Sequence, residues 1–354
     1  MVRRLSREHR AKHYSDLATA VLDDLDMLRT TTVCVFASAA LLCAQNRTRW
    51  ESVRTTPAVL NQETLDRLIS GPSGQLAAVS QKFLLKSADG GMSWSVQRHD
   101  APGRIDAIAF SSPDTLWEAI STPTEGTMFL ASSSDGGATW KKTLTLSSPD
   151  PMGICDIAFF DEAFGIAVGE FELHPLILTT RDGGQSWYVR LLETDDPDYI
   201  LRRVAFRSKS EIWLVGANSM YVSRNAGDNW TLAYHGSAAM LNEIAFGQSD
   251  IFAVGGFGMI LHSPDGGETW NKIGLSEPLA SRFLWSIGLL DSGRAWVAGD
   301  RGTIASTLDG GQTWQMEETG QDEFIRDIKV FGKKVFAIGD NGTLIRRSVN
   351  SGFK

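Results

Sequence analysis

The sequence predicts an all-β fold built from seven copies of a four-stranded unit, and three observations predict it. A short glycine-containing motif returns six times at a regular spacing, the residues between two copies alternate like strands, and each end of the chain carries half of one further copy. Glycine is abundant, at 34 of 354 residues, which suits a fold with many tight turns. Units of this length bury a core only by packing against their neighbours.

The repeated motif has the form Ser/Thr-x-Asp-Gly-Gly-x-Ser/Thr-Trp, and its third residue is always Asp or Asn. This residue falls 40 to 47 positions after the previous copy, at Asp89, Asp135, Asp182, Asn225, Asp265 and Asp309. A period of about this length is that of a four-stranded β-propeller blade. Because an Asp or Asn side chain can accept hydrogen bonds from backbone N–H groups of its own turn, we interpret these residues as structural.

The stretch between two motifs predicts four strands. In the fifth unit the residues 241–246 form an apolar first strand, 251–255 form a second strand that ends in glycine, and 259–263 form an alternating third strand. The tryptophan of the motif then opens the fourth strand. Alternating residues punctuated by Gly and Asp are typical of an all-β domain.

The two ends of the chain predict how the ring closes. Ser348 to Lys354 reads as the first half of a seventh motif with Asn350 in the acceptor position, and Thr48 to Val53 reads as the second half with Trp50. We therefore expect residues 48–54 to supply the outer strand of the last blade and residues 324–350 the inner three. Closure of this kind leaves no open sheet edge in the ring.

The tryptophans fall into two sets. Seven belong to the turn motif and are expected to cover its hairpin: Trp50, Trp94, Trp140, Trp187, Trp230, Trp270 and Trp314. Another set stands at one equivalent position in the second strands, together with two phenylalanines: Trp117, Trp213, Trp296, Phe252 and Phe336. We interpret the second set as packing between blades.

The N-terminus predicts export. Residues 27–44 combine Arg29, a short apolar stretch and a final small residue, Ala44, which is the pattern of a signal peptide. We interpret residues 1–26 as an overrun of the coding start or a disordered leader, and residues 45–354 as the propeller. Cys43 raises the alternative of a lipoprotein anchor. We expect a periplasmic or extracellular protein, associated with a membrane in the lipoprotein case.

The unit resembles a known group of repeats. The amino-acid sequence of the unit is similar to the Asp-box (BNR) repeats, and most similar to those of the photosystem II stability/assembly factor family. An example is the segment from Trp296 to Trp314, which contains the turn Leu308-Asp309-Gly310-Gly311. The resemblance covers residues 46–354 and implies an exported seven-bladed propeller that assists the assembly of a membrane complex. It also implies an arginine-rich surface patch, for which Arg202, Arg203 and Arg207 are the candidates in a chain that is acidic overall.

Composition restricts the ligands. The formal net charge of −8 argues against a sequence-independent nucleic-acid binder, which needs a basic surface.

Glu170, Glu172 and His174 lie in one loop, but a single His beside two acids is weak evidence for a metal site, and we expect a solvated loop. We expect no cofactor and no metal. Cys155 has no recognisable His partner, so we interpret it as a small core residue rather than a nucleophile.

The first strand of each propeller blade lines the central channel, and the start of that strand opens onto one face. The residues at these starts are Asp66-Arg67, Asp106-Ala107, Cys155-Asp156, Arg202-Arg203, Asn242-Glu243, Trp285-Ser286 and Arg326-Asp327. Exposed Arg and Trp are enriched in protein interfaces. The binding residues we predict on this face are Arg67, Arg202, Arg203, Trp285 and Arg326.

Two functions follow from this pattern. The first is a non-catalytic, monomeric scaffold that binds a protein or a membrane complex. The alternative is a glycoside hydrolase acting on a glycan through two carboxylates of the same face, with Asp106, Asp156, Glu243 and Asp327 as candidates. A sialidase would need an Arg-Ile-Pro or Arg-Leu-Pro segment, whereas Arg104-Ile105 is followed by Asp106.

Overall fold

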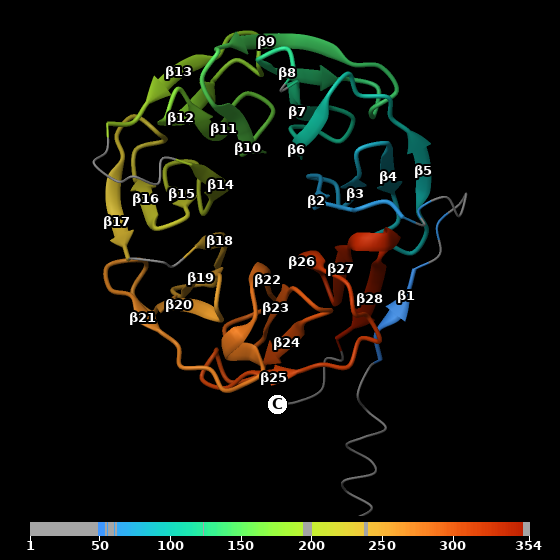
Figure 1. Cartoon of the computed structure of the whole chain (residues 1–354), viewed down its shortest axis with the longest axis vertical. Helices are drawn as coiled ribbons and strands as arrows, with labels where there is room; N and C mark the ends of the chain where they lie inside the picture. Colours follow the sequence, from blue (N-terminus) through green and yellow to red (C-terminus); the bar gives the residue numbers. More distant parts are fainter. Residues whose placement is uncertain are drawn as a thin grey trace, which may run out of the picture. The chain divides into compact units, whose positions relative to one another are not determined.

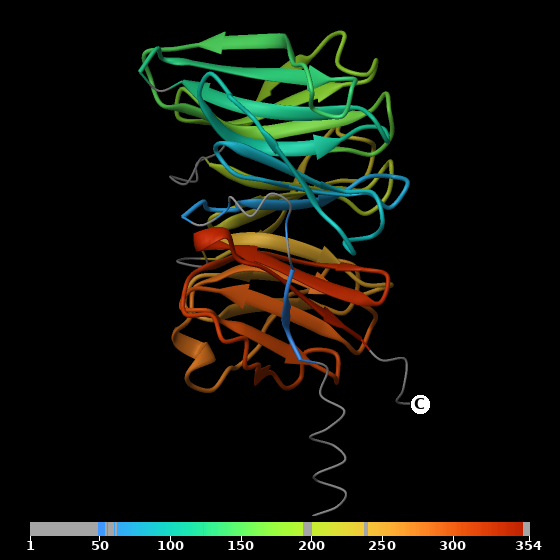
Figure 2. The same ribbon diagram turned by 90° about the vertical axis from the view of Figure 1, so that its right-hand side faces the viewer.

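The computed structural model describes residues 49–53, 55, 60, 62–122, 124–193, 200–236 and 240–349. In these residues the strands form seven four-stranded sheets, all within the compact unit Trp50–Lys354. The sheets stand around a central axis as the blades of a ring (Figure 1), which Figure 2 shows from the side. The predicted seven-bladed propeller is therefore confirmed. The leader 1–26, the export segment 27–44 and Asn350 lie outside the described residues.

Blades are numbered here in chain order, and each runs from an inner to an outer strand. Blade 1 comprises β2 (Arg67–Ser70), β3 (Leu76–Val79), β4 (Phe83–Ser87) and β5 (Ser95–Arg98). Blade 2 comprises β6 (Arg104–Phe110), β7 (Leu116–Thr122), β8 (Thr127–Ser133) and β9 (Lys141–Ser147). Blade 3 comprises β10 (Met152–Phe159), β11 (Gly165–Phe171), β12 (His174–Thr180) and β13 (Tyr188–Leu191).

The next three blades repeat the pattern. Blade 4 comprises β14 (Leu201–Phe206), β15 (Ile212–Gly216), β16 (Ser219–Ser223) and β17 (Thr231–His235). Blade 5 comprises β18 (Leu241–Phe246), β19 (Ile251–Gly255), β20 (Met259–Ser263) and β21 (Asn271–Lys272). Blade 6 comprises β22 (Leu284–Leu289), β23 (Ala295–Gly299), β24 (Ile304–Thr307) and β25 (Gln315–Met316). The outer strands of blades 1 to 6 begin one residue after the motif tryptophan, not at it.

Blade 7 is shared between the two ends of the ring. Its inner strands are β26 (Ile325–Phe331), β27 (Lys334–Gly339) and β28 (Leu344–Ser348), and its outer strand is β1 (Glu51–Ser52). β1 pairs antiparallel with β28, with Glu51 opposite Arg346, and Val53 N donates to Leu344 O at 2.9 Å. The predicted closure is confirmed.

The antiparallel order gives the ring two distinct faces. We call the face where the innermost strands β2, β6, β10, β14, β18, β22 and β26 begin the mouth face. The hairpins between third and fourth strands, which carry the Asp boxes, then lie on the opposite face, called the box face. Two short 3₁₀ turns, η1 (Leu279–Ser281) and η2 (Asp340–Gly342), lie on the mouth face, at the left in Figure 2.

The Asp box is a closed set of hydrogen bonds within one turn. In blade 5, Asp265 Oδ1 accepts from Thr269 N at 2.9 Å and from Ser263 Oγ at 2.8 Å. Asp265 Oδ2 accepts from Thr269 Oγ1 at 2.6 Å, and Ser263 Oγ accepts from Gly267 N at 2.7 Å. These contacts lower the pKa of Asp265 to about 2, chiefly through the Thr269 hydroxyl. The structural interpretation of the boxes agrees with this geometry.

In the boxes of blades 1, 3, 5 and 6 the second glycine contacts an aromatic ring of the preceding blade, whereas Gly137 and Gly227 meet Leu84 and Ile166. A Cβ atom added to Gly184 would stand 2.0 Å from the ring of Trp117, and one added to Gly267 would stand 2.2 Å from the ring of Trp213. Phe336 meets Gly91 in the same way across the closure of the ring. These aromatic residues are buried, so the prediction that they pack between blades is confirmed. Among the described residues, no helix is long and apolar enough to cross a bilayer.

Candidate functional site

A β-bulge near the start of the inner strand divides the predicted ring of residues into two levels. The bulge falls between Leu201 and Arg203 in blade 4, and the same irregularity occurs in blades 2, 3, 5, 6 and 7. A bulge places two residues opposite one on the partner strand and can re-aim a side chain there. Because the inner strands begin at the mouth face, the first residue of each predicted pair lies toward that face and the second lies deeper in the channel.

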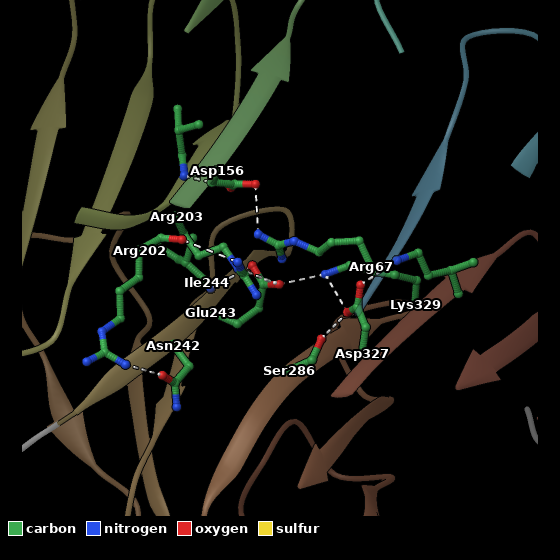
Figure 3. Close-up of polar contacts among 12 residues, drawn as sticks. Arg67, Asp156, Arg202, Arg203, Asn242, Glu243, Ile244, Ser286, Asp327 and Lys329 are labelled. Carbon is green, nitrogen blue, oxygen red and sulfur yellow. Dashed lines mark hydrogen bonds and ion pairs between the residues drawn. The ribbon is translucent and has the colours of Figure 1, made fainter. Parts of the chain in front are cut away.

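The deeper level holds a network of charged side chains (Figure 3). Arg67 Nη2 lies 2.8 Å from Asp156 Oδ1, and Arg203 Nε lies 3.3 Å from Glu243 Oε2. Lys329 Nζ lies 2.7 Å from Glu243 Oε2 and 3.3 Å from Asp327 Oδ1. Three cations thus face three carboxylates, and their formal charges cancel. We call these six residues the channel network.

The network also bonds to the backbone of neighbouring blades. Asp327 Oδ2 accepts from Leu68 N at 2.9 Å, and Asp156 Oδ2 accepts from Val204 N at 3.0 Å. Ser286 Oγ donates to Asp327 Oδ1 at 2.6 Å. Every blade except blade 2, which has Ala107 at the equivalent position, therefore contributes to the network or bonds to it.

The charged side chains of the channel network need their ion-pair partners because they are buried. A carboxylate or guanidinium removed from water is stable only when it is paired and hydrogen-bonded. Burial alone would lower the pKa of Arg67, but the carboxylates of Asp156, Asp327 and Glu243 raise it above the ordinary value. Burial raises the pKa of the Asp156 carboxyl, and Arg67 opposes that shift. The network is therefore a neutral floor across the channel.

Between this floor and the box face lies a cavity of about 450 Å³. Phenylalanines near the ends of the inner strands line its wall, and all are partly exposed: Phe110, Phe159, Phe206, Phe246 and Phe331. Phe159 also stacks on Trp117 with ring centroids 5.3 Å apart. Phe206 and Phe246 likewise contact Phe164 and Trp213 of the preceding blades, so these three phenylalanines belong to the packing between blades as well as to the cavity.

The mouth level holds the first residues of the predicted pairs. Arg202 Nη1 donates to Asn242 Oδ1 at 3.1 Å, and Asn242 Nδ2 donates to Leu284 O at 2.8 Å. This chain of bonds connects blades 4, 5 and 6 next to Trp285. Arg326 Nε lies 2.9 Å from Asp340 Oδ1 in its own blade.

The five predicted binding residues are thus separated by depth. Arg202, Trp285 and Arg326 are partly exposed at the mouth, whereas Arg67 and Arg203 belong to the channel network. The expectation that Arg67 is exposed is wrong, because only 8% of the residue is accessible and its guanidinium is held by Asp156. Arg67 is the first residue of β2, whose pairing with β3 is regular, and its side chain points into the channel network (Figure 3).

Sequence reasoning missed several residues of this site. Lys329 lies two positions after Asp327 on β26, and the two-residue period of a strand could have placed both on one side. Phe283 packs on Trp285 with ring centroids 4.8 Å apart, and Arg282 precedes it in the same loop. These loop residues carry no repeat signal, because they lie between units of the pattern.

The other candidate residues of the sequence analysis, Cys155 and the loop with Glu172 and His174, have surroundings that indicate a structural role. Burial raises the pKa of the Cys155 thiol to about 12, with Asp106 and Glu170 adding to the shift, so the thiol stays protonated at neutral pH. His174 Nδ1 lies 2.8 Å from Glu172 O, and Ser148 Oγ donates to Glu172 Oε1 at 3.0 Å. In the described residues, no group of three His, Cys, Asp or Glu side chains is placed to hold a metal ion.

The fold and the boxes define the chain as an Asp-box (BNR) propeller, and comparisons with known proteins show which proteins of this class it is similar to. The family model described as "Photosynthesis system II assembly factor YCF48" matches residues 143–235, which include all strands of blades 3 and 4. The chain is thus a propeller similar to the photosystem II assembly factors, as its repeats predict.

Two curated relatives carry the same name. The photosystem II assembly lipoprotein Ycf48 of Synechococcus sp. (strain CC9902) is 24% identical over 296 residues, which cover 80% of this chain and 84% of the relative. The photosystem II assembly protein Ycf48 of Thermosynechococcus vestitus is 27% identical over 321 residues, covering 65% of this chain and 89% of the relative.

Solved structures agree on the fold. A structure titled "YCF48 bound to D1 peptide" has a TM-score of 0.66 at 19% identity and covers 86% of this chain and 96% of its own. YCF48 from Cyanidioschyzon merolae has a TM-score of 0.65 at 18% identity, covering 85% of this chain and 98% of its own. A GH74 xyloglucanase from Xanthomonas campestris has a TM-score of 0.63 at 13% identity, covering 86% of this chain but 54% of its own. At these identities the likeness concerns the fold alone.

Proposed function

We propose that the chain is an exported, non-catalytic propeller that holds a protein partner during the assembly of a membrane complex. The observation that carries this proposal is the channel network, which neutralises the carboxylates that a hydrolase would need. Asp156, Glu243 and Asp327 are each within 3.3 Å of a cation. Asp106 lies 2.6 Å from Arg104.

A glycosidase works differently. It needs one carboxyl to donate a proton and a second, ionised one to act as base or nucleophile, with both facing the sugar. In this channel Asp156, Glu243 and Asp327 face cations, and Asp156 and Asp327 also accept from backbone N–H groups of other blades. Asp106 instead pairs with Arg104 of its own blade. The first three carboxylates therefore serve to hold blades together, and the scaffold is favoured over the hydrolase.

The relatives support the rest of the proposal. Two of the relatives named above are photosystem II assembly proteins, and one of them is named a lipoprotein. One similar structure is titled as a complex with a peptide of D1. By analogy, the partner of this chain is a protein segment of a membrane complex, and the chain works outside the cytoplasm at a membrane surface as a monomer.

The mouth face is the proposed binding surface. Arg202, Trp285 and Arg326 are the contact residues, because they are partly exposed there. Arg67 and Arg203 support the surface from below through the channel network. A face built from loops on a rigid ring is where binding residues concentrate in such folds.

Affinity capture paired with a glycan screen tests the proposal. The mature chain, immobilised through its C-terminus, is mixed with solubilised envelope membranes of its host, and the same preparation is offered a panel of glycosidase substrates. Recovery of subunits of one membrane complex, with no turnover, is expected. Turnover of a glycan that disappears in Asp156→Asn or Glu243→Gln, in protein that still folds, would contradict the scaffold.

A further inference from the structure

Three arginines at the mouth of blades 4 to 6 have no ion-pair partner among the described residues. Arg202 is the second residue of β14, Arg282 lies in the loop before β22, and Arg301 lies between β23 and β24. Elsewhere arginines are usually paired, as Arg294 is with Asp291 and Arg224 with Glu268. In a chain of net charge −8, cations left unpaired on one surface are complementary to an acidic partner.

A row of aromatic rings lies beside these arginines. The ring centroids of Phe257 and Phe283 are 6.4 Å apart, and those of Phe283 and Trp285 are 4.8 Å apart. Phe257, at the tip of the loop between β19 and β20, is 66% exposed. Phe283 and Trp285 are partly exposed. Aromatic rings that reach the surface together favour an apolar side chain as their partner.

The loops hold this row in place through backbone contacts. Gly258 N donates to Arg282 O at 2.6 Å, which joins the Phe257 loop to the segment before β22. Asp300 Oδ1 accepts from Phe283 N at 3.0 Å, and Asp300 N donates to Phe283 O at 3.1 Å. Arg301 therefore directly follows Asp300, which holds the backbone of Phe283 through these two hydrogen bonds.

Several nitrogen atoms at this place are buried without a hydrogen-bond acceptor. They are Nε of Arg202, Nε and Nη1 of Arg282, and Nε1 of Trp285. Buried donors are nearly always satisfied in folded proteins. Nε1 of Trp94, Trp187, Trp230 and Trp270 also has no partner among the described residues, so this place is distinguished by having four such nitrogens together at the mouth of blades 4 to 6. Carboxylate oxygens are the acceptors that guanidinium groups bind best.

We propose that Arg202, Arg282, Arg301, Phe257, Phe283 and Trp285, together called the aromatic–arginine crescent, bind an extended peptide segment in which acidic residues flank a large apolar one. The carboxylates reach the arginines and the apolar side chain lies on the aromatic row. A nucleic acid would be repelled by the overall charge of the chain. This inference rests on the proposed function and adds to it the residues and the chemistry of the bound segment.

Binding of short fluorescein-labelled peptides, followed by fluorescence anisotropy, tests the crescent. The probe has one Phe between pairs of Asp in a Gly–Ser background. Peptides with Asn for Asp, Lys for Asp or Gly for Phe are the ligand controls, and they leave the protein unchanged. A single-stranded oligonucleotide is the control for non-specific anion binding.

The acidic aromatic peptide is expected to bind about tenfold or more tightly than each control, because each lost contact of an interface centre typically costs that much. Arg282→Glu with Arg301→Glu should weaken its binding by about the same factor. Arg98→Glu is the matched protein control, because Arg98 lies on outer strand β5 with its side chain 75% exposed. Thermal unfolding shows that each variant is folded.

Equal binding of the acidic and neutral peptides would overturn the inference, as would tighter binding of the oligonucleotide. So would unchanged binding by the double variant. None of these results touches the proposed function, since the chain could still capture a membrane complex through another surface. Failure of the capture experiment alone would instead remove the proposed function and leave the peptide result standing.

Discussion

At the scale of single residues, the two glycines of an Asp box have different reasons to be glycine. Gly90 and Gly91 both have positive φ, at 66° and 78°. A Cβ at Gly90 would meet nothing within 4 Å, whereas a Cβ at Gly91 would stand 2.2 Å from Phe336 of the neighbouring blade. The first glycine serves the turn, and the second also makes room for the packing between blades.

Alanine at each position separates these two reasons. Gly90→Ala should lower the free energy of unfolding by about 1–2 kcal/mol, the cost of left-handed backbone for a residue with a Cβ. Gly91→Ala should cost about 1–3 kcal/mol more, because the new methyl group overpacks the interface. Urea unfolding measures both. Equal losses would mean that Phe336 does not need the second glycine.

The Asp boxes predict a specific dependence on acid. The pKa values of Asp182, Asp265 and Asp309 are lowered to about 2, in each case chiefly by the hydroxyl of the Ser or Thr four residues later. A carboxyl whose pKa is lower in the folded state stabilises the fold at pH values above its unfolded pKa. That contribution disappears as the pH falls from about 4 through 2.

Asp265→Asn removes the charge and keeps one acceptor, as Asn225 does naturally in blade 4. Asn225 Oδ1 still accepts from Asn229 N at 2.9 Å. The variant should be less stable than the wild type at pH 7, and the gap should close between pH 4 and 2. Thermal unfolding across this range is the measurement. A gap that does not change with pH would show that the carboxylate contributes nothing beyond its neutral form.

At the scale of elements, the short strand β1 holds more than its length suggests. Trp50 is buried, and its Nε1 donates to Glu317 Oε2 at 2.7 Å. Glu317 Oε1 also accepts from Trp296 Nε1 at 3.0 Å, and Glu317 forms an ion pair with Arg347. The Glu317 carboxylate of blade 6 thus contacts both the N-terminal segment and the C-terminal strand that together form blade 7.

Truncation of this contact tests the closure. Trp50→Ala should lower the free energy of unfolding by about 3–5 kcal/mol, as for other buried tryptophans. Glu51→Ala is the matched control, because the Glu51 side chain is 68% exposed and should contribute little. Deletion of residues 45–56 should destabilise the ring further and expose the edge of β28. Unchanged thermal stability after that deletion would contradict the closure.

The sequence predicts the elements well because the repeat encodes them locally. The strands expected at 241–246, 251–255 and 259–263 are β18, β19 and β20 with the same bounds. The bulge near the start of the inner strands of blades 2 to 7 was not predictable, because it depends on how two strands pair and leaves no fixed residue type. The depth of Arg67 depends on its ion pair with Asp156 of blade 3, which no local pattern encodes, and so the site was predicted less well than the fold.

At the scale of the whole molecule, ion pairs in the channel connect blades that are not neighbours in the ring. The channel network joins Arg67 of blade 1 to Asp156 of blade 3, and Lys329 of blade 7 to Glu243 of blade 5. Contacts across a ring resist its opening more than contacts between neighbours do. Such a core allows the mouth loops to differ in residues and charge without loss of the fold, as scaffolds with grafted sites do.

The central claim is that the mouth face holds a protein partner. Photocrosslinking tests it most directly, with a photoreactive phenylalanine analogue in place of Phe257 on the mouth face or, as the control, in place of Leu232 on outer strand β17. The two positions have similar exposure, at 66% and 57%. In host envelope membranes, irradiation should attach the Phe257 position, and not the Leu232 position, to a subunit of a membrane complex. Adducts from the Leu232 position alone would contradict the account.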